Sequence, residues 1–202
     1  MRKAHGFNTF GRSAFPGRGS VSGSGALLTL EPLVEAVKDG VEAVGWRLSG
    51  LQKTTSHRFE GRWEGESTRS AYLFFHRDGD EAVGVDVYLD ETSRGLQGNL
   101  ALVVDGAGLR ELGDPAVALE TLASAAGDRL PEGYGMPLSV RLRLADAGAA
   151  ASDADVEIRF KIRIPRAAIQ AGASAVSAVA SASVRAFEAL LAHPDIQHLI
   201  SL

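Results

Sequence analysis

The sequence contains no cysteine among its 202 residues. This absence excludes disulfide bonds, thiolate nucleophiles and every metal site that depends on a cysteine ligand. A chain without disulfides suits a reducing compartment, and we expect a cytoplasmic protein. The first residues also lack the apolar run of about 7–15 residues that a secretory signal requires.

Acidic side chains are missing from residues 1–30, which hold four of the 21 basic residues and none of the 25 acidic ones. The rest of the chain therefore carries 17 basic and 25 acidic residues, a net charge of −8. A basic segment on an acidic body can bind an anionic partner or the acidic body of a neighbouring copy.

Residues 1–26 are rich in glycine and serine, and we expect a flexible N-terminal arm followed by a single domain at 27–202. Three phenylalanines recur in the arm, although a plain spacer has no use for them. We predict partner contacts here; the alternatives are an arm that folds back on its own domain and a disordered tail. The predicted contact residues are Phe7, Phe10, Arg12, Phe15 and Arg18.

Hydrophobic periodicity predicts the order of the remaining elements. Apolar residues at helical spacing indicate a helix at 30–44, with Thr29 as its N-cap. Asp114-Pro115 predicts the start of a second helix that reaches about residue 130. Alternation of apolar and polar residues predicts strands at 54–63, 71–77, 82–90, 99–105, 138–146 and 154–164.

This order indicates an α+β fold, a single antiparallel sheet of about five to six strands with helices packed on one face. The order of elements is similar to that of small secretion chaperones. No residue motif carries that likeness, so it implies nothing about function.

A long helix made mostly of alanine, serine and valine is predicted at 167–192. Its first 18 residues carry no charge, but alanine and serine do not favour a membrane span. The scarcity of charge indicates a helix covered on more than one side, and small side chains allow another backbone to come close. The covering element is either the first helix or a second copy in a two-fold dimer. The predicted dimer contacts are Gly172, Val176, Val179, Ala180 and Phe187.

Motifs for catalysis are not found. The sequence has no nucleophile elbow and no phosphate-binding loop, and its five histidines form no metal-ligand pair at helical or strand spacing. Asp86 and Asp90 share a strand face, but four residues of extended chain separate them by about 13 Å. We therefore expect no cofactor, no metal and no enzymatic activity. His57 and His76 meet only if their strands are neighbours in the correct register.

Basic residues gather on the last two strands, opposite the apolar side chains. Five positive charges stand there against Glu157 alone. We predict a docking face, unless Glu60, Asp86 and Asp90 from neighbouring strands neutralise it. Because aromatic residues are not interleaved with these charges, we favour a protein partner over nucleic acid. The predicted partner-binding residues are Arg141, Arg143, Arg159, Lys161 and Arg163.

The sequence thus favours a non-enzymatic protein-interaction module, either an adaptor, a chaperone-like protein or a complex subunit. Its partner would be an acidic protein segment or a second copy of the chain, as a homodimer. A nucleic-acid-binding protein is the first alternative. The second is a domain that holds a small apolar ligand between the sheet and the last helix, with the aromatic residues Phe59, Trp63, Phe74 and Phe160.

Overall fold

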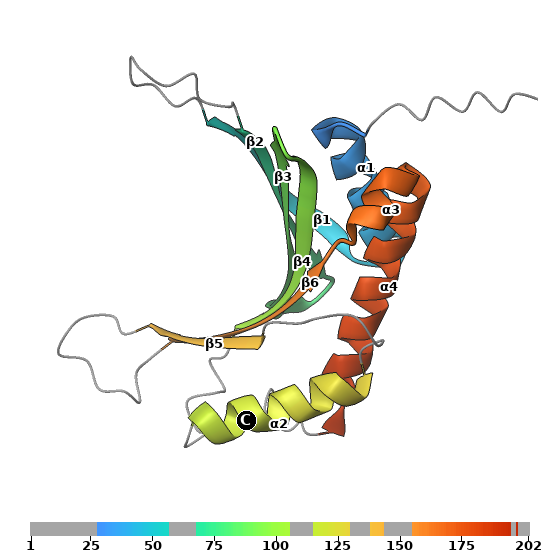
Figure 1. Ribbon diagram of the computed structural model, residues 1–202. Coiled ribbons are helices and arrows are strands. Elements are labelled where there is room, and N and C mark those ends of the chain that lie inside the picture. Colours follow the sequence, from blue (N-terminus) through green and yellow to red (C-terminus); the bar gives the residue numbers. More distant parts are fainter. Residues whose placement is uncertain are drawn as a thin grey trace, which may run out of the picture.

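The computed structural model of the chain describes residues 28–56, 68–105, 115–129, 138–143, 155–194 and 197. Six strands and four helices lie within these ranges (Figure 1). They are α1 (Leu30–Glu42), β1 (Arg47–Ser56), β2 (Thr68–Arg77), β3 (Asp80–Thr92), β4 (Gly95–Asp105), α2 (Pro115–Arg129), β5 (Leu138–Arg143), β6 (Asp155–Arg163), α3 (Arg166–Ala171) and α4 (Ala173–Leu191).

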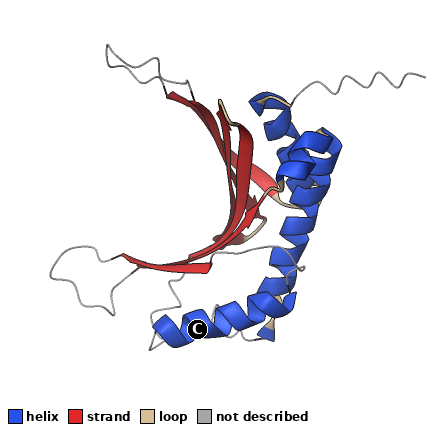
Figure 2. Cartoon of the chain, viewed as in Figure 1, coloured by secondary structure: helices blue, strands red, loops and turns tan. Residues whose placement is uncertain are grey.

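All six strands form one antiparallel sheet with the order β1-β2-β3-β4-β6-β5. The sheet is strongly curved, and the helices lie along its convex side (Figures 1 and 2). α1, α3 and α4 cover the middle of the sheet, and α2 lies below β5 against the far end of α4. The predicted α+β fold, with a single antiparallel sheet and helices on one face, is confirmed.

Alternating side chains explain why only one face of the sheet needs helices. Directly paired residues point to the same face, and the register aligns Leu73, Val87, Leu100 and Ile162 in one row across four strands. None of these four side chains is more than 1% exposed. Full burial of each such side chain contributes about 1.5–3 kcal/mol relative to exposure, so the convex face holds the core.

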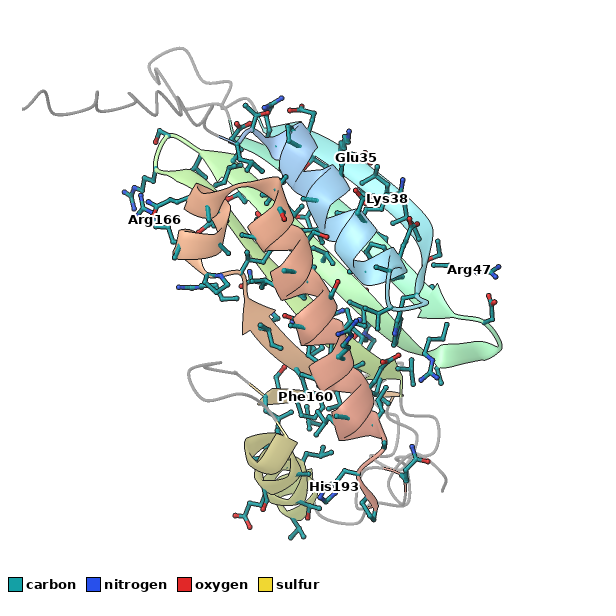
Figure 3. All side chains as sticks on the ribbon, turned by 90° about the vertical axis from the view of Figure 1, so that its right-hand side faces the viewer. Glu35, Lys38, Arg47, Phe160, Arg166 and His193 are labelled. Carbon is teal, nitrogen blue, oxygen red and sulfur yellow. The ribbon has the colours of Figure 1, made fainter. Side chains whose placement is uncertain are left out.

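α1 and α4 lie side by side over this apolar face (Figure 3). α1 buries a stripe that includes Leu33 and Val37, and α4 buries Val176, Ala180 and Phe187. The two helices come into close contact at Gly40, where an added Cβ would stand 2.4 Å from the Ser177 carbonyl oxygen.

The Ser181 hydroxyl donates a 2.7 Å hydrogen bond to the Gly40 carbonyl oxygen. Small residues on both helices therefore permit direct backbone contact between α1 and α4.

The predicted single helix over 167–192 is wrong in one respect. It is broken into α3 and α4 at Gly172, whose φ of +103° lies in a region that residues with a Cβ rarely adopt. Composition predicted the helical residues on either side, but the periodicity of small residues gives no sign of this break.

Other boundaries also differ from the predicted ones, and β2, β3 and β4 each begin two to four residues earlier than predicted. β1 begins at Arg47, seven residues before the predicted strand. The prediction missed this start because Gly50 interrupts the alternation of apolar and polar residues in RLSGLQK, and the register of β1 shifts there. α1 ends at Glu42 rather than at residue 44. Thr29 is the N-cap of α1, but its side chain forms no capping hydrogen bond. His57, Phe59, Glu60 and Trp63 lie outside the described residues.

Substitution Gly40→Ala should destabilise the fold by about 1–3 kcal/mol, because the new methyl group would stand 2.8 Å from the Ala180 Cβ and closer still to the α4 backbone. The control is Gly127→Ala in α2, where an added Cβ meets nothing within 4 Å. That variant should be neutral or up to about 1 kcal/mol more stable, through helix propensity. Urea unfolding followed by circular dichroism measures both, and equal effects would contradict the close helix contact.

Ser183 and Ser181 provide a second matched pair on α4. The Ser183 hydroxyl is fully buried and has no hydrogen-bond partner within the described part of the chain. Ser183→Ala should therefore stabilise the protein by about 1 kcal/mol, since the variant buries no unpaired hydroxyl. Ser181→Ala removes the bond to Gly40 and should cost about 1 kcal/mol. Thermal and urea unfolding would show these opposite signs.

Candidate interaction surface

The concave face of the sheet, here called the open face, is covered by no described helix or strand (Figures 1 and 2). Its side chains follow from the register, because each residue between two core positions points away from the helices. One row across the strands runs Phe74, Asp86, Ala101, Lys161, and the next runs Tyr72, Tyr88, Asn99, Arg163. Aromatic residues on β2 and β3 thus share a face with basic residues on β6.

The aromatic part of the open face is a cross-strand cluster. The Tyr72 and Tyr88 rings are 4.9 Å apart between centroids and inclined by 43°. Tyr72 is 37% exposed and Phe74 is 36% exposed, so these large apolar surfaces remain in contact with water. Partial desolvation, with the neighbouring Tyr88 hydroxyl, raises the pKa of the Tyr72 phenol. Such half-exposed aromatic side chains are typical of sites that bind a partner.

Along β5 and β6 no aromatic side chain is interleaved with the basic ones, as predicted, but the same sheet face carries aromatic side chains on β2 and β3, which the sequence did not place there. Tyr72, Phe74 and Tyr88 belong to strands that precede the basic strands by many residues, and only the pairing of β3, β4 and β6 places them together. The two described members of the aromatic set predicted for an apolar ligand do not converge. Phe74 lies on the open face, whereas Phe160 is buried in the core at 1% exposure.

Arg159 occupies the centre of an ion-pair group on the open face. Its guanidinium lies 3.1 Å from Asp86 and donates a 2.6 Å hydrogen bond from Nε to Glu157. Arg141 lies 3.5 Å from the same Glu157 carboxylate. The predicted neutralisation by Asp86 is thus present. Asp90 instead accepts hydrogen bonds from Ser70 and Gln97, at 2.8 Å and 3.0 Å.

The two carboxylates of this group have opposite pKa shifts. Burial raises the pKa of the Asp86 carboxyl, and the positive charge of Arg159 opposes part of that rise. The hydrogen bond from Arg159 lowers the pKa of Glu157, with smaller contributions from Arg141 and Arg143. Arg159 is therefore a neutralised, structural cation.

Lys161 and Arg163, like Arg143 at the far end of β5, differ from Arg141 and Arg159, which are held in ion pairs. Neither forms an ion pair with any residue that the structure describes. Lys161 is half-buried and Arg163 is exposed, on the two rows that also carry the aromatic side chains. Of the five predicted basic contacts, these two are the ones whose charges remain available on the open face close to the aromatic cluster.

The predicted dimer contacts are mostly occupied within one chain. Val176, Ala180 and Phe187 are fully buried in its core. α1 and the sheet cover these side chains, so a second copy cannot contact them. Val179 is partly buried against the core, and Gly172 is half-buried at the break between α3 and α4. The predicted homodimer itself is tested by no partner chain and stays a prediction. The arm residues Phe7, Phe10, Arg12, Phe15 and Arg18 lie outside the described residues.

By length and composition alone, α4 is apolar enough to cross a membrane. Its apolar seam, however, is buried against α1 and the sheet, which favours the core helix of a globular domain. In the described ranges, no group of three or more histidine, aspartate or glutamate side chains could hold a metal ion.

Comparison with known proteins found no protein family, no curated protein and no solved structure that matches this chain.

The ion-pair group predicts opposite pH dependences for two variants. Because the pKa of Asp86 is raised on folding, its contribution to stability should grow as the pH falls through the acidic range. The pKa of Glu157 is lowered on folding, so its contribution is present near neutral pH and is lost as the pH falls.

Urea unfolding between about pH 3 and about pH 7 tests this pair. The stability of the wild type relative to Asp86→Asn should increase towards low pH, whereas relative to Glu157→Gln it should decrease. The same slope for both variants would contradict the assignment of opposite shifts.

Proposed function

We propose that this protein is a non-enzymatic interaction domain that holds an acidic, aromatic-bearing segment of a partner protein on the open face. One observation supports the proposal most. A sheet face without helix cover presents half-exposed Tyr72 and Phe74 on the same rows as the unneutralised cations Lys161 and Arg163.

The dimensions of the open face suit a short extended peptide that runs across the strands. Neighbouring strands are about 4.8 Å apart, so Tyr72 and Arg163, three strands apart on one row, are separated by about 14 Å. An extended chain covers that distance in about four or five residues. An apolar or aromatic side chain at one end would pack on the tyrosines, while a carboxylate at the other end meets a guanidinium.

A protein segment suits this face better than a phosphate backbone. Asp86, Asp90 and Glu157 place three carboxyl groups on the open face, and the whole chain has a net charge of −4. Nucleic acid binds when basic side chains neutralise several of its phosphates, and the three carboxylates would repel those phosphates. The aromatic pair is nevertheless a surface on which bases could stack, so nucleic acid is the alternative that the experiment must separate.

Within this proposal the basic arm at 1–26 provides additional contacts, and the protein acts in the cytoplasm as an adaptor, chaperone-like protein or complex subunit. Support for that part comes from the sequence alone: the arm combines three phenylalanines with four basic residues.

The test selects peptides of about 12 residues from a random displayed library on the full-length protein, a length that spans the open face with room for flanking residues. The selected peptides should be enriched in aspartate, glutamate and aromatic residues. Their affinity, measured by fluorescence anisotropy, should fall about tenfold or more in the variants Tyr72→Ser and Lys161→Glu, since each removes a central contact. Binding should also weaken between about 50 mM and about 300 mM salt.

Leu51→Ser and Arg185→Glu are the matched controls, because both residues are exposed and lie away from the open face. They should leave the affinity unchanged. The proposal fails if the open-face variants bind the selected peptides as well as the wild type does, or if the selection yields basic peptides. Tighter binding of an oligothymidine of similar length would favour the nucleic-acid alternative instead.

A further inference from the structure

A cavity of about 510 Å³ lies at the end of the sheet where the β3–β4 hairpin turns beside α3. Figure 3 shows Arg166 at this end of the molecule, where α3 meets the sheet. The volume falls within the range of about 300–1,000 Å³ that small-molecule sites occupy. The residues that line it are Thr92, Arg94, Gly95, Leu96, Gln97, Arg163, Ile164, Arg166 and Ile169.

Three arginines from three separate elements line this cavity. Arg94 lies in the hairpin turn, Arg163 ends β6 and Arg166 begins α3. No acidic residue is found among the described residues of the lining, and none of the three arginines forms an ion pair with any residue that the structure describes. Guanidinium groups keep their positive charge at all physiological pH values, so three positive charges gather around this cavity.

The other polar side chains of the lining are already engaged. The Thr92 hydroxyl donates to the Gly95 carbonyl oxygen at 3.2 Å and accepts from the Arg94 backbone N–H at 3.1 Å. The Gln97 amide donates to Asp90 at 3.0 Å. These bonds fix the hairpin turn, and the arginines are left as the main donors that a ligand could use.

The inner part of the cavity is apolar and firmly held. Ile164 and Ile169 are 2% and 8% exposed, and Leu96 packs against the same core. The Ile164 backbone N–H donates to the Gly98 carbonyl oxygen at 2.9 Å, which ties the end of β6 to β4. A Cβ at position 98 would stand 2.9 Å from the Ile164 side chain, so there is little room for this wall to move.

We infer that this cavity binds a phosphate monoester of a small organic molecule, with the phosphate among the three arginines and the organic group on the isoleucines. Guanidinium groups match phosphate oxygens in paired hydrogen bonds, and three of them suit a dianion better than a single carboxylate. The inference does not depend on the proposed function. Arg163 is shared with the open face, whereas Arg94 and Arg166 belong to the cavity alone.

The test is calorimetric titration of the full-length protein with phenyl phosphate, inorganic phosphate and benzoate as three separate probes. The wild type should bind phenyl phosphate at one site. Inorganic phosphate should bind more weakly because it lacks the apolar group, and benzoate should bind more weakly because it has a single charge. The double variant Arg94→Gln/Arg166→Gln should lose at least about tenfold in affinity for phenyl phosphate, because two of the three guanidiniums are gone. Arg185→Gln removes one exposed, unpaired charge from α4 and should change nothing.

Circular dichroism would show whether the double variant is folded. If the double variant is unfolded, the two single variants Arg94→Lys and Arg166→Lys provide a milder second measurement. Each lysine keeps the charge but loses the guanidinium fork, so each single variant should still bind phenyl phosphate more weakly than the wild type does. The inference is overturned if the wild type shows no saturable binding of phenyl phosphate up to about 10 mM, because a specific site of this size should have a dissociation constant below that concentration. It is also overturned if benzoate binds as tightly as phenyl phosphate, or if the arginine variants bind with unchanged affinity.

Discussion

The contact between α1 and α4 at Gly40 is the constraint on which the rest of the structure depends. The Ser177 carbonyl oxygen is only 2.4 Å from the place where a Cβ at position 40 would stand, and the two helices thus lie close enough to cover the apolar side of the sheet together. The row of Leu73, Val87, Leu100 and Ile162 is buried by that cover. The described helices all lie on this side of the sheet, so none covers the other side, and the concave face is free to carry aromatic and charged groups.

This contact also explains the unusual composition of the last helix. Alanine and serine at positions such as 177, 180 and 181 contribute little transfer energy, but they allow backbone approach and a hydrogen bond between helices. Sequence reasoning inferred correctly that the helix is covered on more than one side. It could not decide between α1 and a second copy, because small residues at helical spacing indicate only that some backbone is near.

The fold class and the faces of each strand could be predicted because both depend on local periodicity. The candidate surface could not, because it depends on register. Tyr72 and Tyr88 are 16 positions apart in sequence and meet only through the pairing of β2 with β3, while Arg163 joins their row through β4. Asp86 could be named from the sequence as a possible counter-charge for the basic face, but only the register shows that it pairs with Arg159. The break at Gly172 depends on a backbone angle that composition does not reveal.

Arg163 connects the two proposed sites through electrostatics. By register its side chain belongs to the row of Tyr72 and Tyr88, and it also lines the cavity beside Arg94 and Arg166. A phosphate held in the cavity would use part of the positive charge that Arg163 offers to an acidic segment on the open face. Coupling between two binding sites is reciprocal, so an acidic segment would weaken phosphate binding by the same factor. Two anionic ligands that share one cation compete in free energy even when they do not touch, and in this fold the end of β6 is the place where the two proposed ligands would do so.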